Sequence, residues 1–430
     1  MNPVKIVYNW IGPNGPIPNT ETPNLLNLAG VMPEVQVRST KFWADDIWHK
    51  IFIKNPENFQ LAPAFPINAD DVFIYPMYVS WRIDFEKYFL KDNGILEFGH
   101  VPNHIIHHVR MNKGYFLIEM AAEAYVRWNH LNALQTYFIH NQIPLNKIIY
   151  LTGCMNPDDV YYNVAPPDAE KINLVTFPVS QASLASHLTS VPPPEEPDYP
   201  VDFVPEKKFL MWNRRYRRHR YAMALMMEQN GLTEKNYISM PLVSDENSSK
   251  FTDHLDYEFL GHIGVTADTV TSFVAKLPLV LDGETDIQKM CSDFDNATRS
   301  FYQNSLVSII TETNFDDSEL TLTEKSFKPM KEKHPFIIVG VPNALKSLKS
   351  LGYKTFSDFW SEDYDSIADH WDRAKEIMRV CNEIAQWDDN KIRDFRVRVK
   401  DILDYNYNNL KVDGAHFAYQ EVLKIVRGDQ

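Results

Sequence analysis

Five arginines and one histidine lie within eight residues of the chain, in the segment 213–220 (NRRYRRHR). This segment directly follows an apolar run, 208–212 (KFLMW), and opens a stretch with helical periodicity. Anionic ligands bind in α/β sheets where a strand end leads into a helix N-terminus. We therefore expect Arg214, Arg218 and Arg220 to grip a diphosphate. A solvated basic surface or a nucleic-acid patch would have the same composition.

A second pattern whose residue types could bind a ligand runs from 307 to 340 (VSIITETNFDDSELTLTEKSFKPMKEKHPFIIVG). A strand is predicted to end at Glu312, a polar loop follows, and Thr323, Glu324 and Lys325 open a helix. Glutamates at a strand end and a helix start can bind the vicinal hydroxyls of a ribose, and Lys325 beside them can neutralise a phosphate. Helix capping by Thr323, with ordinary surface charge, would explain the tripeptide alone.

The 307–340 segment resembles the donor-binding domain of the α-1,3-fucosyltransferases and related GT-B glycosyltransferases. That family has a strand ending in F-E-N-S, a short loop, T-E-K, a helix and a closing G-x-V-P-V-V-x-G strand. Glu312 matches the first glutamate, 323–325 matches T-E-K, and 334–340 (HPFIIVG) matches the closing strand. Thr313-Asn314 stands where the family has Asn-Ser.

The family also has an arginine near the first helix of this domain, after a strand ending in Asn. Asn213 with Arg218 or Arg220 fits that place. The resemblance implies a nucleotide-sugar donor, with Glu324 on the ribose and Lys325 with an arginine on the diphosphate. The stretch 348–365 (LKSLGYKTFSDFWSEDYD) is similar to glycosyltransferase-like proteins of large viruses and phages.

The N-terminal half is expected to supply a catalytic base. An inverting transfer needs a group that takes the proton of the acceptor hydroxyl. Glu119 ends an apparent strand and is the first candidate, and Glu123 follows one helical turn later. Asp84 and Asp70 are alternatives. A carboxylate stabilised by a helix dipole would explain the same residues without catalysis.

Metal binding is not expected, and the nucleotide sugar is a co-substrate, so no cofactor is predicted. Four histidines between positions 100 and 108 could include a zinc pair on one helix face, but no HExxH motif accompanies them. Two Asp-x-Asp spacings, 293–295 and 363–365, resemble the metal site of GT-A enzymes. The second spacing precedes a predicted helix, where capping explains acidic residues.

Apolar runs that alternate with helical patterns must position these residues. The strands are predicted at 4–10, 72–78, 115–119, 148–152, 208–212, 307–311 and 335–340. Helices are predicted over 121–139, 220–230 and 366–385. This alternation predicts an α/β fold with parallel sheets that are covered on both faces.

The proline-rich segment 191–205 (VPPPEEPDYPVDFVP) divides the chain, because proline disfavours helix interiors and central strands. We expect an acceptor-binding domain over 1–190, a linker over 191–205, a donor-binding domain over 206–390 and C-terminal helices over 391–430. The predicted architecture is two Rossmann-like domains facing a cleft, of the GT-B type, with a helical tail.

Composition excludes several classes of protein. A net charge of −14 argues against a general nucleic-acid or anionic-membrane coat, and 44% hydrophobic residues exclude global disorder. Three cysteines suit buried thiols in a reducing compartment. With no signal peptide or long apolar run, we expect a cytoplasmic protein without a membrane span, in the host cytoplasm if viral.

These patterns predict a metal-independent glycosyltransferase that moves a sugar from a nucleotide-diphosphate sugar to a glycan or nucleic-acid acceptor. Arg218 or Arg220 and Lys325 would stabilise the departing diphosphate. Two alternatives stay open. One is a DNA-modifying glycosyltransferase acting on hydroxymethylated bases, with 391–400 (KIRDFRVRVK) along the phosphates. The other is a non-catalytic assembly protein with a degenerate nucleotide-binding fold.

Overall fold

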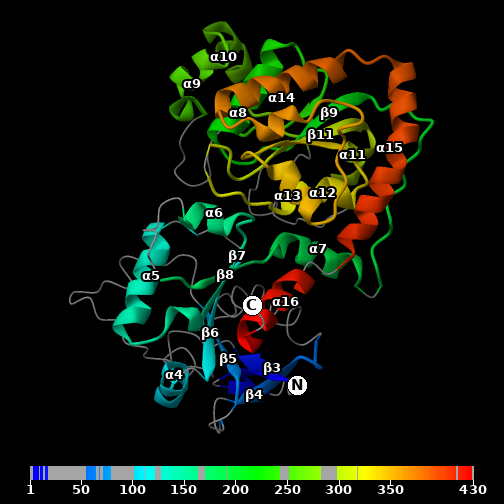
Figure 1. The fold of residues 1–430 in the computed structure, drawn as a ribbon. Helices are drawn as coiled ribbons and strands as arrows, with labels where there is room; N and C mark the ends of the chain where they lie inside the picture. The colour runs from blue at the N-terminus through cyan, green and yellow to red at the C-terminus, as the bar shows by residue number, and fades with distance from the viewer. Residues whose placement is uncertain are drawn as a thin grey trace. The chain divides into compact units, whose positions relative to one another are not determined.

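The chain forms two units, residues 1–183 with 413–430 (unit 1) and residues 184–412 (unit 2). The structure is a computed structural model (Figure 1). It describes residues 3–17, 55–63, 67, 71–78, 101–162, 170–242, 251–281 and 298–428, except 9, 13–14, 112, 122–125, 127, 191, 317 and 413–414. Each unit contains a parallel sheet with helices, which confirms the predicted α/β class.

Unit 1 contains a six-stranded parallel sheet with the strand order β4-β1-β5-β6-β7-β8. Its strands are β1 (Val4–Tyr8), β4 (Phe59–Pro63), β5 (Phe73–Tyr78), β6 (Gly114–Met120), β7 (Ile148–Thr152) and β8 (Asn173–Thr176). A short antiparallel ribbon joins β2 (Trp10–Gly12) to β3 (Gly15–Ile17). The described side chains of the central strands β5 and β6 are mostly apolar and buried, as expected of a sheet covered on both faces.

Helices cover both faces of this sheet. One core contains side chains from α4 (Asn103–Arg110) and α5 (Trp128–His140), packed around Phe116. The opposite core contains α16 (Ala415–Arg427), whose Val422 packs with Leu117 of β6. The elements α6 (Pro157–Tyr162), η2 (Leu145–Lys147) and α7 (Val179–Leu188) complete this part of the chain.

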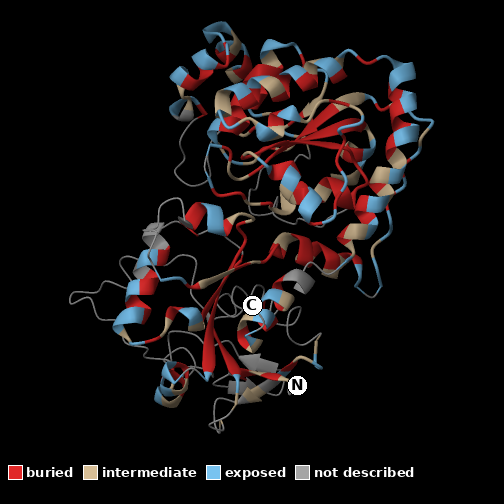
Figure 2. Ribbon diagram, viewed as in Figure 1, coloured by how far each residue is buried: buried red, intermediate tan, exposed pale blue. Residues whose placement is uncertain are grey.

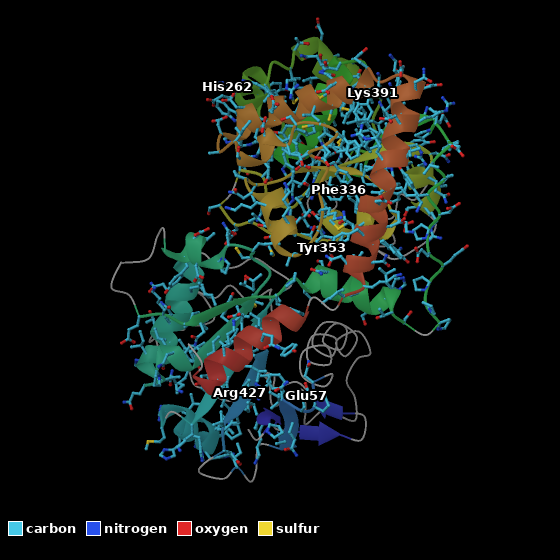
Figure 3. The ribbon with its side chains drawn as sticks, turned by 45° about the vertical axis from the view of Figure 1, so that its right-hand side comes forward. Glu57, His262, Phe336, Tyr353, Lys391 and Arg427 are labelled. Atoms are coloured by element: carbon cyan, nitrogen blue, oxygen red, sulfur yellow. The ribbon has the colours of Figure 1, made fainter. Side chains whose placement is uncertain are left out.

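The last helix therefore belongs to unit 1 although it follows unit 2 in the sequence. Tyr115 Oη donates a hydrogen bond to the carbonyl oxygen of Ile425 at 3.2 Å. Arg427 Nη2 donates to Asn58 Oδ1 at 3.0 Å, and the side chains of Arg427 and Glu57 lie in the same part of unit 1 (Figure 3). These contacts fix the C-terminal end of the chain to the sheet of unit 1.

Unit 2 contains a four-stranded parallel sheet with the strand order β10-β9-β11-β12. The strands are β9 (Lys207–Met211), β10 (Tyr237–Ile238), β11 (Ser305–Thr311) and β12 (Phe336–Val339), and the last two are buried along their whole length (Figure 2). The helices are α8 (Arg218–Gln229), η3 (Phe251–His254), α9 (Tyr257–His262), α10 (Ala267–Val274), α11 (Arg299–Gln303), α12 (Glu324–Lys331), α13 (Ala344–Ser350), η6 (Asp363–Ser366), α14 (His370–Ala385) and α15 (Asp389–Leu410).

Most predicted strands are confirmed with small shifts at their ends, but the strand predicted over 4–10 is divided into β1 and β2, and three helix starts differ. The helix predicted over 121–139 begins only at Trp128, as α5. Helix α8 begins at Arg218, two residues before the predicted start. Helix α14 begins at His370 rather than at 366, because the Asp369 carboxylate caps it by accepting from Trp371 N and Asp372 N, both at 2.9 Å.

The proline-rich segment is attached to unit 2. The guanidinium of Arg396 lies 4.2 Å from the ring centre of Tyr199 and donates to the carbonyl oxygen of Pro200 at 2.6 and 3.1 Å. Glu196 pairs with Lys333 at 2.6 Å and with Lys411 at 3.3 Å. The segment is therefore held along α15 by both stacking and charge.

Two further expectations concern thiols and membranes. Cys154 and Cys381 are buried and form no disulfide, as predicted, and burial raises the pKa of the Cys381 thiol to about 12. Cys291 lies outside the described residues. No helix in the described part of the chain is both long enough and apolar enough to cross a bilayer.

Candidate active site

Three strands of unit 2 end at the same edge of the sheet, where Asn213, Glu312 and Gly340 follow β9, β11 and β12. The Glu312 N–H still donates to Val339 O, at 3.0 Å. A Cβ atom at position 340 would lie 3.6 Å from Glu312 Cβ and only 3.2 Å from a side-chain methyl of Ile338. A glycine at this position avoids that close contact. The two sequence patterns, 213–220 and 307–340, therefore meet at one place.

Both carboxylate oxygens of Glu312 accept hydrogen bonds from donors within the protein. Glu312 is 1% exposed, and its carboxylate accepts from Thr313 N at 3.0 Å and from Ser326 Oγ at 2.6 Å. It also accepts from Thr323 N at 3.0 Å and Thr323 Oγ1 at 2.7 Å. Four donors satisfy both oxygens, so in this arrangement the carboxylate fixes the start of α12.

The main chain of Glu312 is bound to the start of α8. His219 Nε2 donates to the Glu312 carbonyl oxygen at 2.7 Å, and Arg220 Nη2 donates to the same oxygen at 3.3 Å. Glu312 thus links the first turns of α8 and α12 through opposite ends of one residue. The two helix starts that the sequence associated with phosphate binding are rigidly connected.

His219 is neutral in this position. Burial, together with the charge of Arg220, lowers the pKa of the imidazole to about 3. The ring also stacks on Phe315, with ring centres 5.2 Å apart. His219 could not be selected from the basic segment by sequence alone, since its role depends on contacts with the loop after β11.

Arg220 is the predicted arginine that is buried without a direct ion pair to any described carboxylate. It is 5% exposed, and its Nε has no hydrogen-bond partner. No carboxylate among the described residues forms an ion pair with it. Burial and the nearby Arg217 lower its pKa to about 10, although the charges of Glu312 and Glu324 act to raise it, so it is still a cation at neutral pH. A buried cation that forms no direct ion pair is costly, and a bound anion would reduce that cost.

Other arginines of the segment 213–220 are engaged elsewhere. Arg218 is 40% exposed and pairs with Asp256 at 3.2 Å and with Asp316 at 3.1 Å. Arg217 donates to the carbonyl oxygen of Thr313 at 3.1 Å. Arg214 is partly buried and has interactions of its own. Of the two alternatives left open by the sequence, the geometry favours Arg220 over Arg218.

The first residues of α12 present a partly exposed ion pair. Lys325 Nζ lies 3.0 Å from Glu324 Oε1 and donates to Thr323 Oγ1 at 2.8 Å. Burial alone would raise the pKa of Glu324, but the charge and hydrogen bond of Lys325, together with the charge of Lys328, outweigh it and the pKa falls to about 2. Glu324 is therefore ionised at neutral pH, and both side chains can reach a ligand.

Arg373 also belongs to this edge of the sheet and was not among the residues predicted from the sequence. Its fully buried guanidinium donates to Gly340 O at 3.0 Å and to Ile367 O at 2.7 Å, and it also bonds the carbonyl oxygens of Ala368 and Phe315. It lies 4.5 Å from the ring centre of Phe315. The sequence does contain a sign of this role: Arg373 lies on the apolar face of a predicted helix, and an arginine there must bury its charge and find hydrogen-bond acceptors.

The proposed catalytic bases cannot be placed from their side chains. Glu119 lies in β6, where its backbone pairs with Tyr78 and Leu151, and its side chain is outside the described part. Glu123, Asp84 and Asp70 are not among the described residues. The acceptor side of the reaction therefore stays a prediction.

The candidate metal ligands have other roles where the structure describes them. The Asp365 carboxylate caps α13 by accepting from Leu345 N at 2.8 Å and Lys346 N at 3.1 Å. In α4, His108 Nδ1 donates to the His104 carbonyl oxygen at 2.7 Å. Residues 293–295 and His100 lie outside the described part. Within that part, no group of three His, Cys, Asp or Glu side chains could hold a metal ion.

Several basic side chains of the stretch 391–400, which the DNA-modifying alternative used, already have partners within the protein. Arg396 is buried against the proline-rich segment. Arg398 pairs with Asp394 at 3.2 Å, and Lys400 pairs with Asp404. Lys391 lies over the ring of Trp387 at 4.6 Å. Most of its charge is therefore used within α15 and its neighbours.

The sequence matches no known protein-family model and no curated protein. Among solved structures, the chain is similar to the OtsA apo structure at 10% identity over 93% of this chain and 80% of that one, with a TM-score of 0.40. It is also similar to the N-terminal domain of Candida albicans trehalose-6-phosphate phosphatase at 8% identity, covering 100% and 97%, with a TM-score of 0.43. A putative UDP-N-acetylglucosamine 2-epimerase from Listeria monocytogenes gives 10% identity, 98% and 95% coverage and a TM-score of 0.31. At such low TM-scores, the chemistry must be judged from the site alone.

Proposed function

We propose that the chain is a glycosyltransferase whose unit 2 binds a nucleotide-diphosphate sugar at the carboxyl edge of its sheet. The observation that carries this proposal is the buried guanidinium of Arg220, which has a free Nε and no carboxylate partner among the described residues. It is tied through Glu312 to the helix start that bears Glu324 and Lys325. Two cations on linked helix starts suit the two phosphates of a diphosphate.

In this proposal each residue has a separate task. Arg220 and Lys325 bind the diphosphate and stabilise the negative charge that develops as it leaves, so that no metal ion is needed. The ionised Glu324 accepts hydrogen bonds from the ribose hydroxyls. Glu312 holds the two helix starts in register and does not touch the donor.

The acceptor would bind in unit 1, in a GT-B arrangement. A carboxylate there, Glu119 or Glu123, takes the proton from the acceptor hydroxyl while that oxygen forms a bond to the sugar carbon. The bond between the sugar and the diphosphate breaks, and the nucleoside diphosphate leaves with the electron pair. The fucosyltransferase-like 307–340 segment supports this class of donor.

The test is hydrolysis of a panel of nucleotide sugars, with water as the acceptor and EDTA present, measured as release of nucleoside diphosphate by the wild type and Glu324→Ala. We expect release from one nucleotide class and at least a tenfold loss, about the strength of a charge-assisted hydrogen bond, in the variant. Glu376→Ala is the matched control, since Glu376 pairs with Arg379 on the surface of α14. No release from any nucleotide sugar, or equal rates in both variants, would refute the proposal.

A further inference from the structure

A second buried donor without a partner lies at the same edge of the sheet. Asn213 follows β9 and is 5% exposed, yet its Nδ2 has no hydrogen-bond partner. Its Oδ1 accepts from the hydroxyl of Thr311 at 2.8 Å, which fixes the amide so that Nδ2 is the free end. A buried donor that forms no hydrogen bond costs free energy, and a folded protein rarely keeps one without a use for it.

The position of Asn213 is rigid. Its N–H donates to Ser239 Oγ at 2.9 Å, and the same hydroxyl donates to the Asn213 carbonyl oxygen at 3.2 Å. Thr311, which holds the amide, directly precedes Glu312, whose carbonyl oxygen binds Arg220. The free Nδ2 and the free Nε of Arg220 are thus held by neighbouring residues of one strand end.

We infer that Asn213 is a direct ligand of the donor's diphosphate, to which its Nδ2 donates a hydrogen bond beside Arg220. This inference rests on the proposed function and adds a neutral binding residue to the charged ones. An amide N–H₂ can only donate, so it selects an oxygen acceptor and does not require the ligand to be protonated. Phosphate oxygens are such acceptors, and the surrounding arginines favour an anion.

The experiment is calorimetric titration of the full chain with inorganic pyrophosphate, UDP and GDP. Asn213→Asp keeps the acceptor for Thr311 but replaces the free donor with a negative oxygen, and we expect its affinity to fall by at least about tenfold. The double variant Asn213→Ala/Thr311→Val removes both partners of the internal bond. Its unfolding midpoint should stay within about 3 °C of the wild type or rise, while its affinity falls.

Asn406→Ala is the matched control. Asn406 is also buried, but both ends of its amide are used, by Lys354 N at 2.9 Å and Lys354 O at 2.8 Å. We expect this variant to lose stability and to keep its affinity. If the wild type binds a diphosphate and the Asn213 variants bind it equally well, the role of Asn213 is refuted alone. If the wild type binds none of the three compounds, the proposed function fails as well.

Discussion

The carboxylate of Glu312 accepts hydrogen bonds from both the N–H and the hydroxyl of Thr323, at 3.0 and 2.7 Å. Thr323 is the N-cap of α12, and its own side chain makes no capping bond within the helix. A residue at a strand end therefore does the work of a helix cap. These bonds hold the start of α12, with the residues proposed to contact the donor, in a fixed position relative to β11.

Glu312→Gln tests this relation. The substitution keeps the size of the side chain but replaces one carboxylate oxygen with an NH₂ group. This new donor would face N–H and O–H groups that now donate to the oxygen, so their hydrogen bonds would be lost. We expect the free energy of unfolding to fall by about 1–3 kcal/mol, the cost of a buried unpaired group. Urea denaturation measures it. In the control Glu376→Gln, which weakens a surface pair with Arg379, the loss should stay below about 1 kcal/mol. Equal losses in the two variants would contradict the role of Glu312.

Lys325→Ala should separate activity from stability. Lys325 is partly exposed, and its pair with Glu324 contributes little to folding, so the unfolding midpoint should hardly change. Loss of a cation that stabilises the leaving diphosphate should reduce transfer about 100- to 1000-fold. Initial rates at saturating donor measure this effect, and Lys375→Ala on the surface of α14 is the control. A variant with near-normal transfer would exclude Lys325 from the reaction.

Arg373→Met should destabilise unit 2, because several carbonyl oxygens would lose their donor at once. We expect a loss of about 2–4 kcal/mol in the free energy of unfolding. Arg379→Met removes an exposed arginine of the same helix and should cost less than about 1 kcal/mol. Similar values for the two variants would show that Arg373 does not fasten the loop at Phe315.

The stability of unit 2 should decrease as the pH falls below neutrality. His334 is buried, with Nε2 donating to Ser305 O at 2.9 Å and Nδ1 accepting from the Ser308 hydroxyl at 2.9 Å. Burial lowers its pKa from 6.5 to about 4. Between these values the unfolded chain binds a proton that the folded chain does not, so stability is lost as the pH falls from 6.5 towards 4.

His334→Gln measures this contribution. Between pH 7 and pH 5 the buried histidine should account for about 2 kcal/mol of the decrease in unfolding free energy. The variant should have a correspondingly shallower dependence on pH, whatever its stability at pH 7. Urea titrations of both proteins at the two pH values decide the matter. Parallel curves would contradict a neutral, buried His334.

Most of the strands and their alternation with helices could be predicted from the sequence, because strands covered on both faces are largely apolar. The strands β4, β8 and β10 were not predicted. Residues 148–152 were predicted as a strand, and β7 has those bounds. Since parallel strands end at one edge, the meeting of 213–220 with 307–340 could also be anticipated. Helix boundaries were less certain, as the start of α14 shows.

The roles of individual residues within the site could not be predicted, since they depend on contacts. Glu312 and Glu324 have the same side chain in the same segment, yet one carboxylate is buried under four donors and the other is partly exposed. Arg218 and Arg220 are two positions apart on α8. On the helix, two residues that far apart point in different directions: Arg218 faces two aspartates, whereas Arg220 is buried. These directions depend on where the helix begins, at Arg218, which the sequence did not define.

The most direct test of the central claim is a thermal-shift panel of nucleoside diphosphates and nucleotide sugars, with Mg²⁺ or with EDTA, on the wild type and Lys325→Ala. A ligand at 100 times its Kd should stabilise the protein by about 2.7 kcal/mol, which is easily measured. We predict a selective shift with one nucleotide class that EDTA leaves unchanged and that Lys325→Ala abolishes or greatly reduces. No shift with any compound, or a shift that requires Mg²⁺, would contradict a metal-independent donor site at this edge of the sheet.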